Sequence, residues 1–217
     1  MKGRYGVRKK NKKAVVLSIL AVVAAVLVAG TAGVFALCQS WLQDLPDYTN
    51  VDEFNVAKPS TVYASDRTTV LAEFQLENRT PVEYDQVSEL VLKGTVATED
   101  ERFYDHGGVD LMGVARAVVN NLLGGELEGA STITQQFVRN TILSDEMTDI
   151  SFKRKIREMY IALKLEEQYS KDEILLMYLN TINYGSGAYG IEAASERYFS
   201  KHASDLTLVE AATLIGI

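Results

Sequence analysis

The chain has 217 residues, enough for one substantial hydrophobic core and too few for two large domains. Hydrophobic residues make up 47%, which is typical of a folded protein and excludes a disordered chain. The net charge of −7 is unevenly spread, because residues 1–13 hold seven of the 22 basic residues and no acidic one. The other 15 basic residues face all 29 acidic ones, so the remaining chain is strongly acidic. This balance argues against nucleic acid as a partner.

Residues 14–38 form an apolar run without a charge. A helix of roughly 20 residues crosses the hydrocarbon core of a membrane. The alternative is a cleaved signal peptide, but its apolar region is usually only about 7–15 residues and ends in small residues. We therefore predict a retained transmembrane helix at 14–38, with residues 1–13 as a basic tail in the cytoplasm. The protein would lie in the cell membrane as a single-pass protein with its remaining domain outside the cytoplasm.

After the predicted membrane helix the sequence indicates a polar juxtamembrane linker at 39–60. Residues 61–74 alternate apolar and polar side chains around the turn SDRT, which predicts a short β-hairpin. From residue 84 onward the apolar period is helical. Four polar residues precede apolar runs as candidate helix caps, three of them with a capping-box spacing: Asp110, Thr132, Ser170 and Thr207. The sequence thus predicts a mainly α domain at 61–217, which ends inside an apolar helix and is expected to be C-terminally truncated.

The stretch TEDERFYDHGGVD at 98–110 is the first candidate for chemistry. Glu99 ends an apolar helical run, and the aromatic Phe103 follows closely enough to remove water from a carboxylate. His106 lies beside two glycines, where its ring can hold a carboxylate in place. A general base needs a carboxylate positioned in this way. The alternative is a solvated acidic loop between helices.

Three further stretches carry polar groups in suggestive patterns. GASTITQQ at 129–136 begins a helix, where free backbone N–H groups bind anions, although an ordinary helix cap explains it equally well. RKIRE at 154–158 puts two bases and Glu158 on one helical face, either as a phosphate-binding patch beside a carboxylate or as a surface ion-pair ladder. NTINYGSGAYGIEAASERYF at 180–199 is a glycine-rich turn, but without a preceding strand it is not a dinucleotide fingerprint.

The order of these motifs is more specific than any one of them. The series ED-x-x-F-x-x-H-x-G, G-x-ST-x-x-QQ, RK-x-x-E, K-x-x-IL-x-x-YLN and YG-x-G-x-YGI-x-AA-x-x-x-YF resembles the peptidoglycan glycosyltransferase (transglycosylase) family. The chain is similar in particular to the N-terminal part of class A penicillin-binding proteins. The resemblance covers about residues 61–217. It implies a lysozyme-like α fold with a small β-hairpin or jaw element near the membrane.

The resemblance also implies an activity and its partners. Family members polymerise lipid II by inverting transfer of the donor MurNAc to the acceptor GlcNAc 4-hydroxyl, with release of undecaprenyl pyrophosphate. By matching position, Glu99 would be the general base. Glu158 would be the second glutamate, which assists near the donor or binds a divalent cation such as Mg²⁺ or Mn²⁺; no prosthetic group is implied. The expected partners are lipid II, the growing glycan strand, the bacterial cytoplasmic membrane and the cell-wall synthesis machinery.

Further residues match substrate-binding positions of the family. They would orient Glu99, place the sugars and phosphates, supply positive charge for the pyrophosphate, or form the glycine-rich turn. The matching residues are Asp100, Phe103, His106, Ser131, Thr132, Gln135, Gln136, Arg139, Arg154, Lys155, Tyr184 and Gly185.

Two other functions remain open from the sequence. A lysozyme-like, glycan-cleaving enzyme also uses a helix-borne glutamate, but as an acid toward the bridging oxygen. The basic RK-x-x-E motif and the retained membrane helix favour a lipid-pyrophosphate donor instead. A non-catalytic, membrane-anchored glycan-binding protein would need neither Glu99 nor Glu158, and replacing either by Gln would leave its function intact.

Overall fold

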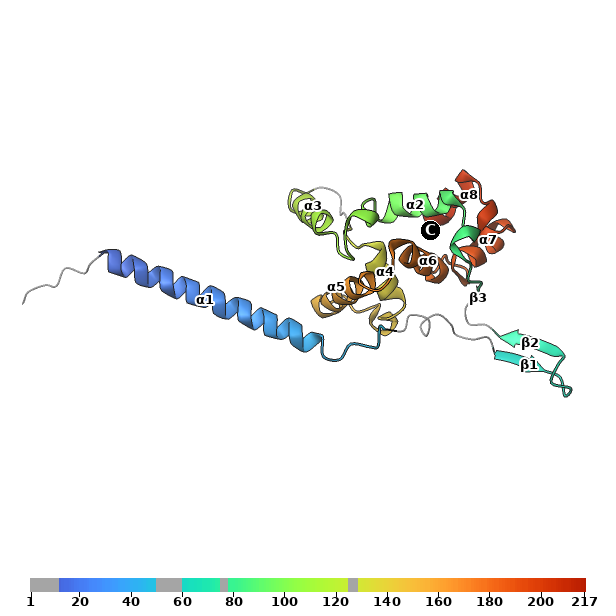
Figure 1. Cartoon of the computed structure of the whole chain (residues 1–217), viewed down its shortest axis with the longest axis horizontal. Helices are drawn as coiled ribbons and strands as arrows, with labels where there is room; N and C mark the ends of the chain where they lie inside the picture. The colour runs from blue at the N-terminus through green and yellow to red at the C-terminus, as the bar shows by residue number, and fades with distance from the viewer. Residues whose placement is uncertain (1–11, 50–59, 75–77, 125–128) are drawn as a thin grey trace, which may run out of the picture. The chain divides into compact units, whose positions relative to one another are not determined.

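The computed structural model describes residues 12–49, 60–74, 78–124 and 129–217, and it divides into two units, residues 1–44 and 45–217. The first unit contains the helix α1 (Lys12–Trp41), drawn in blue in Figure 1. Its stretch Val15–Trp41 has a mean hydropathy of 2.7 and no buried part, so it is long and apolar enough to cross a membrane. The predicted membrane helix falls on α1. Residues 1–11 of the predicted tail and 50–59 of the predicted linker lie outside the described residues.

The second unit is mainly α, which confirms the predicted fold class (Figure 1). Its strands are short and its helices are connected by turns. In chain order the elements are β1 (Ser60–Tyr63), β2 (Val70–Phe74), β3 (Asn78–Arg79), α2 (Glu89–Glu99), α3 (Leu111–Leu122), α4 (Ile133–Asn140), α5 (Phe152–Glu166), α6 (Lys171–Thr181), β4 (Ala188–Tyr189), α7 (Ile191–Phe199) and α8 (Leu208–Ile215).

The predicted hairpin is formed by β1 and β2, which pair antiparallel with Thr61 opposite Glu73. Its turn is held by Asp66, whose Oδ1 accepts the backbone N–H groups of Thr68 and Thr69 at 3.0 and 2.9 Å. Aspartate favours turns because its side chain can satisfy such backbone donors. The second pair, β3 with β4, is parallel and only two residues long in each strand. It was not predicted, because two residues show no periodicity.

Local side chains define where most helices begin. Ser170 and Thr207 form complete capping boxes at α6 and α8, with Glu173 and Glu210 bonding back to the cap residue, as predicted. At α4 the prediction was only half right. The Thr132 hydroxyl accepts the Gln135 backbone N–H at 3.2 Å, but the Gln135 side chain does not return to the cap and bonds elsewhere in the fold.

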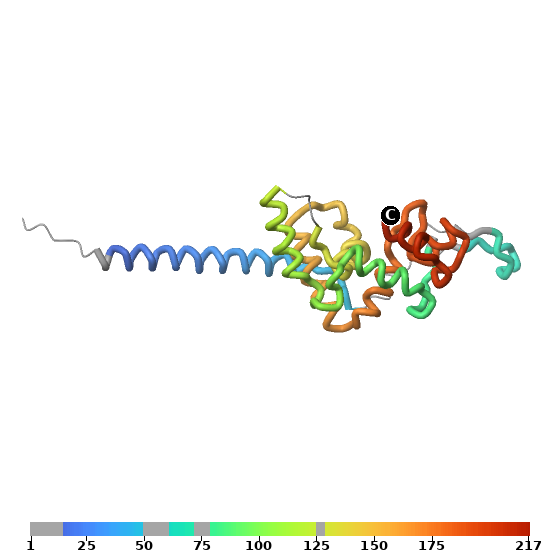
Figure 2. The backbone as a smooth tube through the Cα atoms, turned by 90° about the horizontal axis from the view of Figure 1, so that it is seen from above, coloured from blue at the N-terminus to red at the C-terminus, as the bar shows by residue number. Residues whose placement is uncertain are grey.

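The hydrophobic core is built around α4. This helix packs against α5 and α6, while α2 packs against α8. Figure 2 shows the C-terminal helices α7 and α8 close together, which agrees with their contacts. Burial of a large apolar side chain contributes about 1.5–3 kcal/mol to folding, so a core of this size explains why the second unit is folded. Its fully buried side chains include Phe103, Ile133, Phe137, Ile161, Leu165, Leu175 and Leu179.

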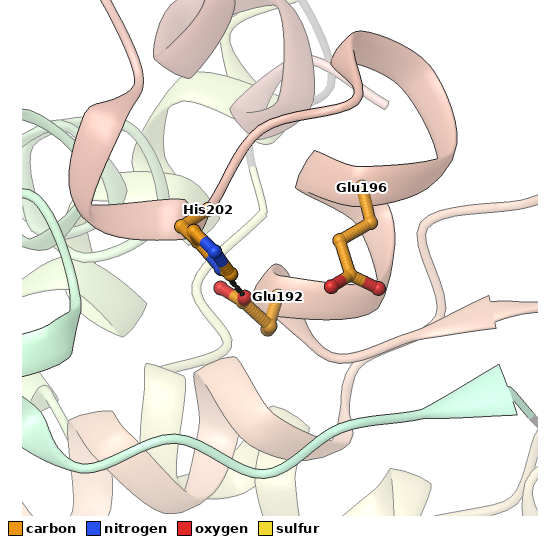
Figure 3. Close-up of side chains that lie close together, drawn as sticks. All are labelled: Glu192, Glu196 and His202. Atoms are coloured by element: carbon orange, nitrogen blue, oxygen red, sulfur yellow. Dashed lines mark hydrogen bonds and ion pairs between the residues drawn. The ribbon is translucent and has the colours of Figure 1, made fainter.

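A carboxylate ties α7 to the turn that follows it. Glu192 is 5% exposed, and its two oxygens accept the backbone N–H of Ala203 at 2.7 Å and Nδ1 of His202 at 2.6 Å. Figure 3 shows Glu192 facing His202, with Glu196 one turn further along α7. The hydrogen bond to Glu192 and the charge of that carboxylate raise the pKa of His202. This pair therefore stabilises the link between the first turn of α7 and the turn after the helix most strongly while His202 is protonated.

Candidate active site

A cavity of about 650 Å³ opens where the end of α2, the 98–110 loop, α3 and the start of α4 meet. The predicted residues Glu99, Asp100, Ser131, Thr132, Gln136 and Arg139 all line it. A second cavity of about 220 Å³ lies beside it and is lined by Glu99, Gln136, Tyr178 and Tyr184. Glu99 and Gln136 therefore belong to both cavities and form the wall between them.

Glu99 is the last residue of α2 and is half-buried. Its Oε2 accepts a hydrogen bond from Nε2 of Gln136 at 2.7 Å. The other atom of that amide, Oε1, accepts the hydroxyl of Tyr178 at 3.2 Å. Burial, followed by the charge of Glu99, raises the pKa of Tyr178, so this hydroxyl stays protonated and acts as the donor. The carboxylate of Glu99 is thus held at the cavity wall by an oriented side chain.

The neighbouring carboxylate, Asp100, has a different role. It is 8% exposed and accepts the backbone N–H of Ile133 at 3.1 Å through Oδ2. Nε2 of His106 lies 3.0 Å from both of its oxygens. An anion at a helix N-terminus is favourable because the first N–H groups of the helix lack partners. Asp100 and His106 therefore fasten the 98–110 loop to the start of α4 and fix the chain directly after Glu99.

Phe103 lies beneath this loop. Its ring is fully buried, with an edge-on contact to His106 at a centroid distance of 6.3 Å. The ammonium of Lys171 lies 4.3 Å from the Phe103 ring centroid, a cation–π contact. Phe103 and His106 are not among the residues that line the two cavities. They support the loop and line neither of these cavities.

The glycine turn of the loop is fixed to two helices. The carbonyl oxygen of Gly108 accepts the Thr132 hydroxyl at 2.7 Å and the Gln135 amide at 3.3 Å. Gly108 has a φ of +81°, and a Cβ there would lie 2.8 Å from the backbone carbonyl of Ala162 on α5. Only glycine satisfies both conditions without strain. Thr132 and Gln135 thus position the loop. The Gln135 side chain does not complete the predicted capping box because it donates to the Gly108 carbonyl instead.

Glu158 is fully buried and lies outside both cavity linings. Its oxygens accept Nη1 of Arg154 and Nζ of Lys155, each at 2.6 Å. Lys155 also donates to Ser131 Oγ at 2.9 Å and to Gln135 Oε1 at 2.7 Å. The alternative of an exposed ion-pair ladder is wrong, because the shared carboxylate has no exposed surface. Glu158 instead pairs with two basic side chains, of which Lys155 contacts the start of α4.

The surroundings of Glu158 do not fit a divalent cation. Both carboxylate oxygens already contact positively charged groups, and a metal ion placed there would be repelled by Arg154 and Lys155. A magnesium or manganese site would need several oxygen ligands around the ion. The metal-binding role that the family resemblance implies for Glu158 therefore gains no support from this geometry.

Tyr184 and Gly185, the two residues predicted from the glycine-rich turn, have different places in the structure. Tyr184 is buried and lines the smaller cavity, and its carbonyl accepts the hydroxyl of Tyr198 at 2.8 Å. Gly185 has a φ of +78° and lines neither of the two cavities. Its place in the motif is explained by backbone conformation, because a positive φ favours glycine.

Two residues of the site were missed from the sequence. Arg116 on α3 lines the larger cavity together with Arg139 on α4, so positive charge enters from two helices. Arg116 is the single basic residue in the otherwise uncharged run LMGVARAVVNNLL, and this isolation was the available signal. Tyr178 lies in the YLN of the fourth motif, and its hydroxyl contact with Gln136 could not be inferred from spacing.

Comparisons with known proteins point to one family. The family model described as "Transglycosylase" matches residues 67–217. Penicillin-binding protein 1A of Escherichia coli (strain K12) is 40% identical over 200 residues, which cover 92% of this chain and 23% of that protein. Penicillin-binding protein 1F of Bacillus subtilis (strain 168) is 47% identical over 148 residues, 68% of this chain and 20% of that protein.

A third relative is Penicillin-binding protein 1A of Neisseria flavescens, 43% identical over 174 residues, with 80% of this chain and 21% of that protein covered. The chain thus spans about a fifth of the length of these curated relatives. The match of the family model extends over more than half of the chain and includes both cavities and their lining residues. The chain belongs to the transglycosylase family.

Proposed function

We propose that the protein is a peptidoglycan glycosyltransferase that polymerises lipid II into glycan strands in bacterial cell-wall synthesis. The observation that carries this proposal is the position of Glu99 in the wall shared by two cavities, one of them lined by Arg116 and Arg139. Glycosyl transfer needs two sugar sites that meet at one base. The family membership and the names of the relatives support the same activity.

In the proposed reaction Glu99 takes the proton from the 4-hydroxyl of the acceptor GlcNAc. The oxygen attacks the anomeric carbon of the donor MurNAc from the opposite side to the leaving group, which gives inversion. The bond between that carbon and the pyrophosphate oxygen breaks, and undecaprenyl pyrophosphate leaves with the electron pair. A carboxylate suits this role when it is fixed within hydrogen-bond reach of the hydroxyl.

The positions of Arg116 and Arg139 suggest which cavity takes the donor and which the acceptor. A pyrophosphate leaving group accumulates negative charge in the transition state, and fixed cations stabilise it without a general acid. Arg116 and Arg139 bring such charge to the larger cavity, which we assign to the donor. The smaller cavity is lined by Tyr178 and Tyr184 and would take the acceptor sugar. Lys155 does not line the larger cavity, but it donates a hydrogen bond to Ser131, which does.

The membrane topology completes the proposal. The helix α1 would anchor the chain as a single-pass membrane protein, with the basic N-terminal residues in the cytoplasm and the catalytic unit outside it. Beside the larger cavity, α3 exposes a row of large apolar side chains: Leu111 (75%), Met112 (68%) and Leu122 (81%). Such a surface suits a substrate whose lipid chain stays in the bilayer. Lipid II, the growing strand and other cell-wall synthesis proteins are the proposed partners.

Polymerisation of labelled lipid II by the detergent-solubilised protein tests this function, with Glu99→Gln beside the wild type. We expect glycan from the wild type and a loss of about 100-fold or more in Glu99→Gln, because the base is removed while its shape is kept. Glu196→Gln is the matched control, since Glu196 is exposed on α7 and lines neither cavity. It is expected to polymerise at the wild-type rate.

Two outcomes would contradict the proposal. Normal polymerisation by Glu99→Gln, with folding confirmed, would show that Glu99 is not the base. A wild-type protein that ignores lipid II but shortens preformed glycan would instead be a glycan-cleaving enzyme. Binding of labelled lipid II to Glu99→Gln separates a loss of chemistry from a loss of substrate affinity.

A further inference from the structure

The amide of Gln136 lies between a hydrogen-bond acceptor, Glu99, and a hydrogen-bond donor, Tyr178. On one side Nε2 donates to Oε2 of Glu99 at 2.7 Å, and on the other Oε1 accepts the Tyr178 hydroxyl at 3.2 Å. The three side chains come from the end of α2, from α4 and from α6. We propose that Tyr178 is a positioning residue, which sets the orientation of the Gln136 amide and thereby holds the Glu99 carboxylate in place as the base. This inference rests on the proposed function.

The argument begins with donors and acceptors. An ionised carboxylate only accepts hydrogen bonds, and a tyrosine hydroxyl has a single proton to donate. Tyr178 is 3% exposed and protonated, so it offers that proton to Gln136 and to no other group recorded in the described part of the structure. The amide oxygen is therefore drawn toward Tyr178. Its NH₂ group is then the end that faces Glu99.

Without the Tyr178 hydroxyl the amide loses one of the two groups that set its orientation, and only Glu99 still favours the NH₂ end. Its two orientations differ by half a turn about one bond and have nearly the same shape. With Oε1 turned toward Glu99, the carboxylate would meet a second acceptor, which favours its protonated form. The wild-type arrangement disfavours this state, because a buried hydroxyl without a hydrogen-bond acceptor costs about 1–3 kcal/mol. Tyr178 thus acts on the base through Gln136.

Other charged groups surround Glu99 and define the background for any pH effect. Asp100, Glu101 and Arg102 follow it in the chain, and Arg102 is paired with Asp110 at the start of α3. Arg116 on α3 and Arg139 on α4 face the same cavity, and Tyr184 faces the smaller one. In the described residues Gln136 is the one side chain recorded as a hydrogen-bond donor to Glu99. Replacement of the Tyr178 hydroxyl leaves all these charges in place.

The test compares Tyr178→Phe with the wild type in lipid II polymerisation over a range of pH. We expect kcat to fall about tenfold at neutral pH, with KM changed less than twofold, and the acid limb of the kcat profile to move to higher pH. Tyr84→Phe is the matched control. It also removes one hydroxyl, 3.4 Å from Asp172, but away from both cavities that contain Glu99.

A double-mutant cycle then shows whether the effect passes through Gln136. In a Gln136→Leu background the amide is absent, so Tyr178→Phe is expected to change kcat by less than twofold. If Tyr178→Phe causes the same loss in both backgrounds, the two residues act independently and the proposal is wrong. An unshifted acid limb in Tyr178→Phe, with an unchanged melting temperature, would also overturn it.

A measurement that does not depend on enzyme activity tests the positioning role of Tyr178 separately from the proposed function. The side-chain NH₂ of Gln136 is followed by ¹⁵N–¹H NMR in the unliganded protein. In the wild type we expect one strongly downfield amide proton, bonded to Glu99, which disappears in both Tyr178→Phe and Glu99→Leu. If the wild type does not polymerise lipid II, the function fails and this spectrum still decides the arrangement. An unchanged Gln136 signal in Tyr178→Phe would refute the positioning role.

Discussion

Nζ of Lys155 lies 2.6 Å from Oε1 of Glu158, a carboxylate that has no exposed surface. The same ammonium reaches Ser131 and Gln135 at the start of α4. This network connects α5 to the wall of the larger cavity, although Glu158 itself does not reach it. Glu158 therefore acts on the site through the basic residues that it holds.

Replacement of Glu158 by Gln is expected to destabilise the fold as well as reduce activity. It leaves Arg154, which is 12% exposed, and Lys155 without their shared counter-charge. Breaking a buried pair in this way costs about 3 kcal/mol. Urea unfolding measures this change, with Glu99→Gln as a variant expected to unfold near the wild-type midpoint. Equal midpoints for Glu158→Gln and the wild type would show that Glu158 has no structural role.

Two adjacent glycines allow a matched test of the loop turn. Gly108→Ala is expected to cost roughly 3 kcal/mol, because it combines a positive φ with a Cβ 2.8 Å from the Ala162 carbonyl. Gly107→Ala is expected to change stability little, since a Cβ there has no atom within 4 Å. Thermal unfolding of the two variants checks the contrast. If both behave alike, the close approach of the loop to α5 is not rigid.

His202 predicts a pH dependence of stability. Its pKa is raised in the folded state by the hydrogen bond to Glu192 and by that charge. The resulting stabilisation is fully present below the unfolded pKa of about 6.5 and is lost as the pH rises through the folded pKa. The melting temperature of the wild type should exceed that of His202→Gln at pH 6 and approach it at pH 9. A constant difference across this range would exclude the linkage.

Arg139 is expected to act on the donor pyrophosphate. Arg139→Ala should lower kcat/KM for lipid II by about 10–100-fold, because a fixed cation at the leaving group is lost. Arg139→Lys keeps the charge and should retain more activity, although the planar fork is gone. Arg197→Ala provides the control, since Arg197 is exposed on α7 and lines neither cavity. A similar loss in Arg197→Ala would indicate a general effect of net charge.

The elements that depend on neighbouring residues were predictable from the sequence. The hairpin followed from alternation around SDRT, and the starts of α6 and α8 followed from Ser170 and Thr207. The pair β3–β4 was not, because Arg79 and Tyr189 are far apart in the chain and each strand has only two residues. Periodicity reports local geometry, and pairing between distant segments leaves no such trace.

The same limit applied within the site. Glu99 and Gln136 were singled out from motifs, but their hydrogen bond spans 37 residues and the contact of Gln136 with Tyr178 spans 42. The Gln135 side chain was expected to complete a capping box, and the carbonyl of Gly108 and the ammonium of Lys155 prevailed as its partners. Such choices depend on which tertiary partners compete for one amide. Sequence motifs identify the residues but not the hydrogen bonds between them.

The wall that Glu99 and Gln136 form between the two cavities has a consequence for inhibitors. Fragments bound on either side of it would share these contacts and lie within a short linker of each other. Joining two weak fragments raises the effective concentration of the second one, so the linked compound can bind far more tightly than either part. Arg116 and Arg139 in the larger cavity offer partners for an acidic group on one fragment, and the tyrosine-lined cavity suits a sugar-like or aromatic fragment. A bivalent ligand of this design would occupy the place of both substrates at once.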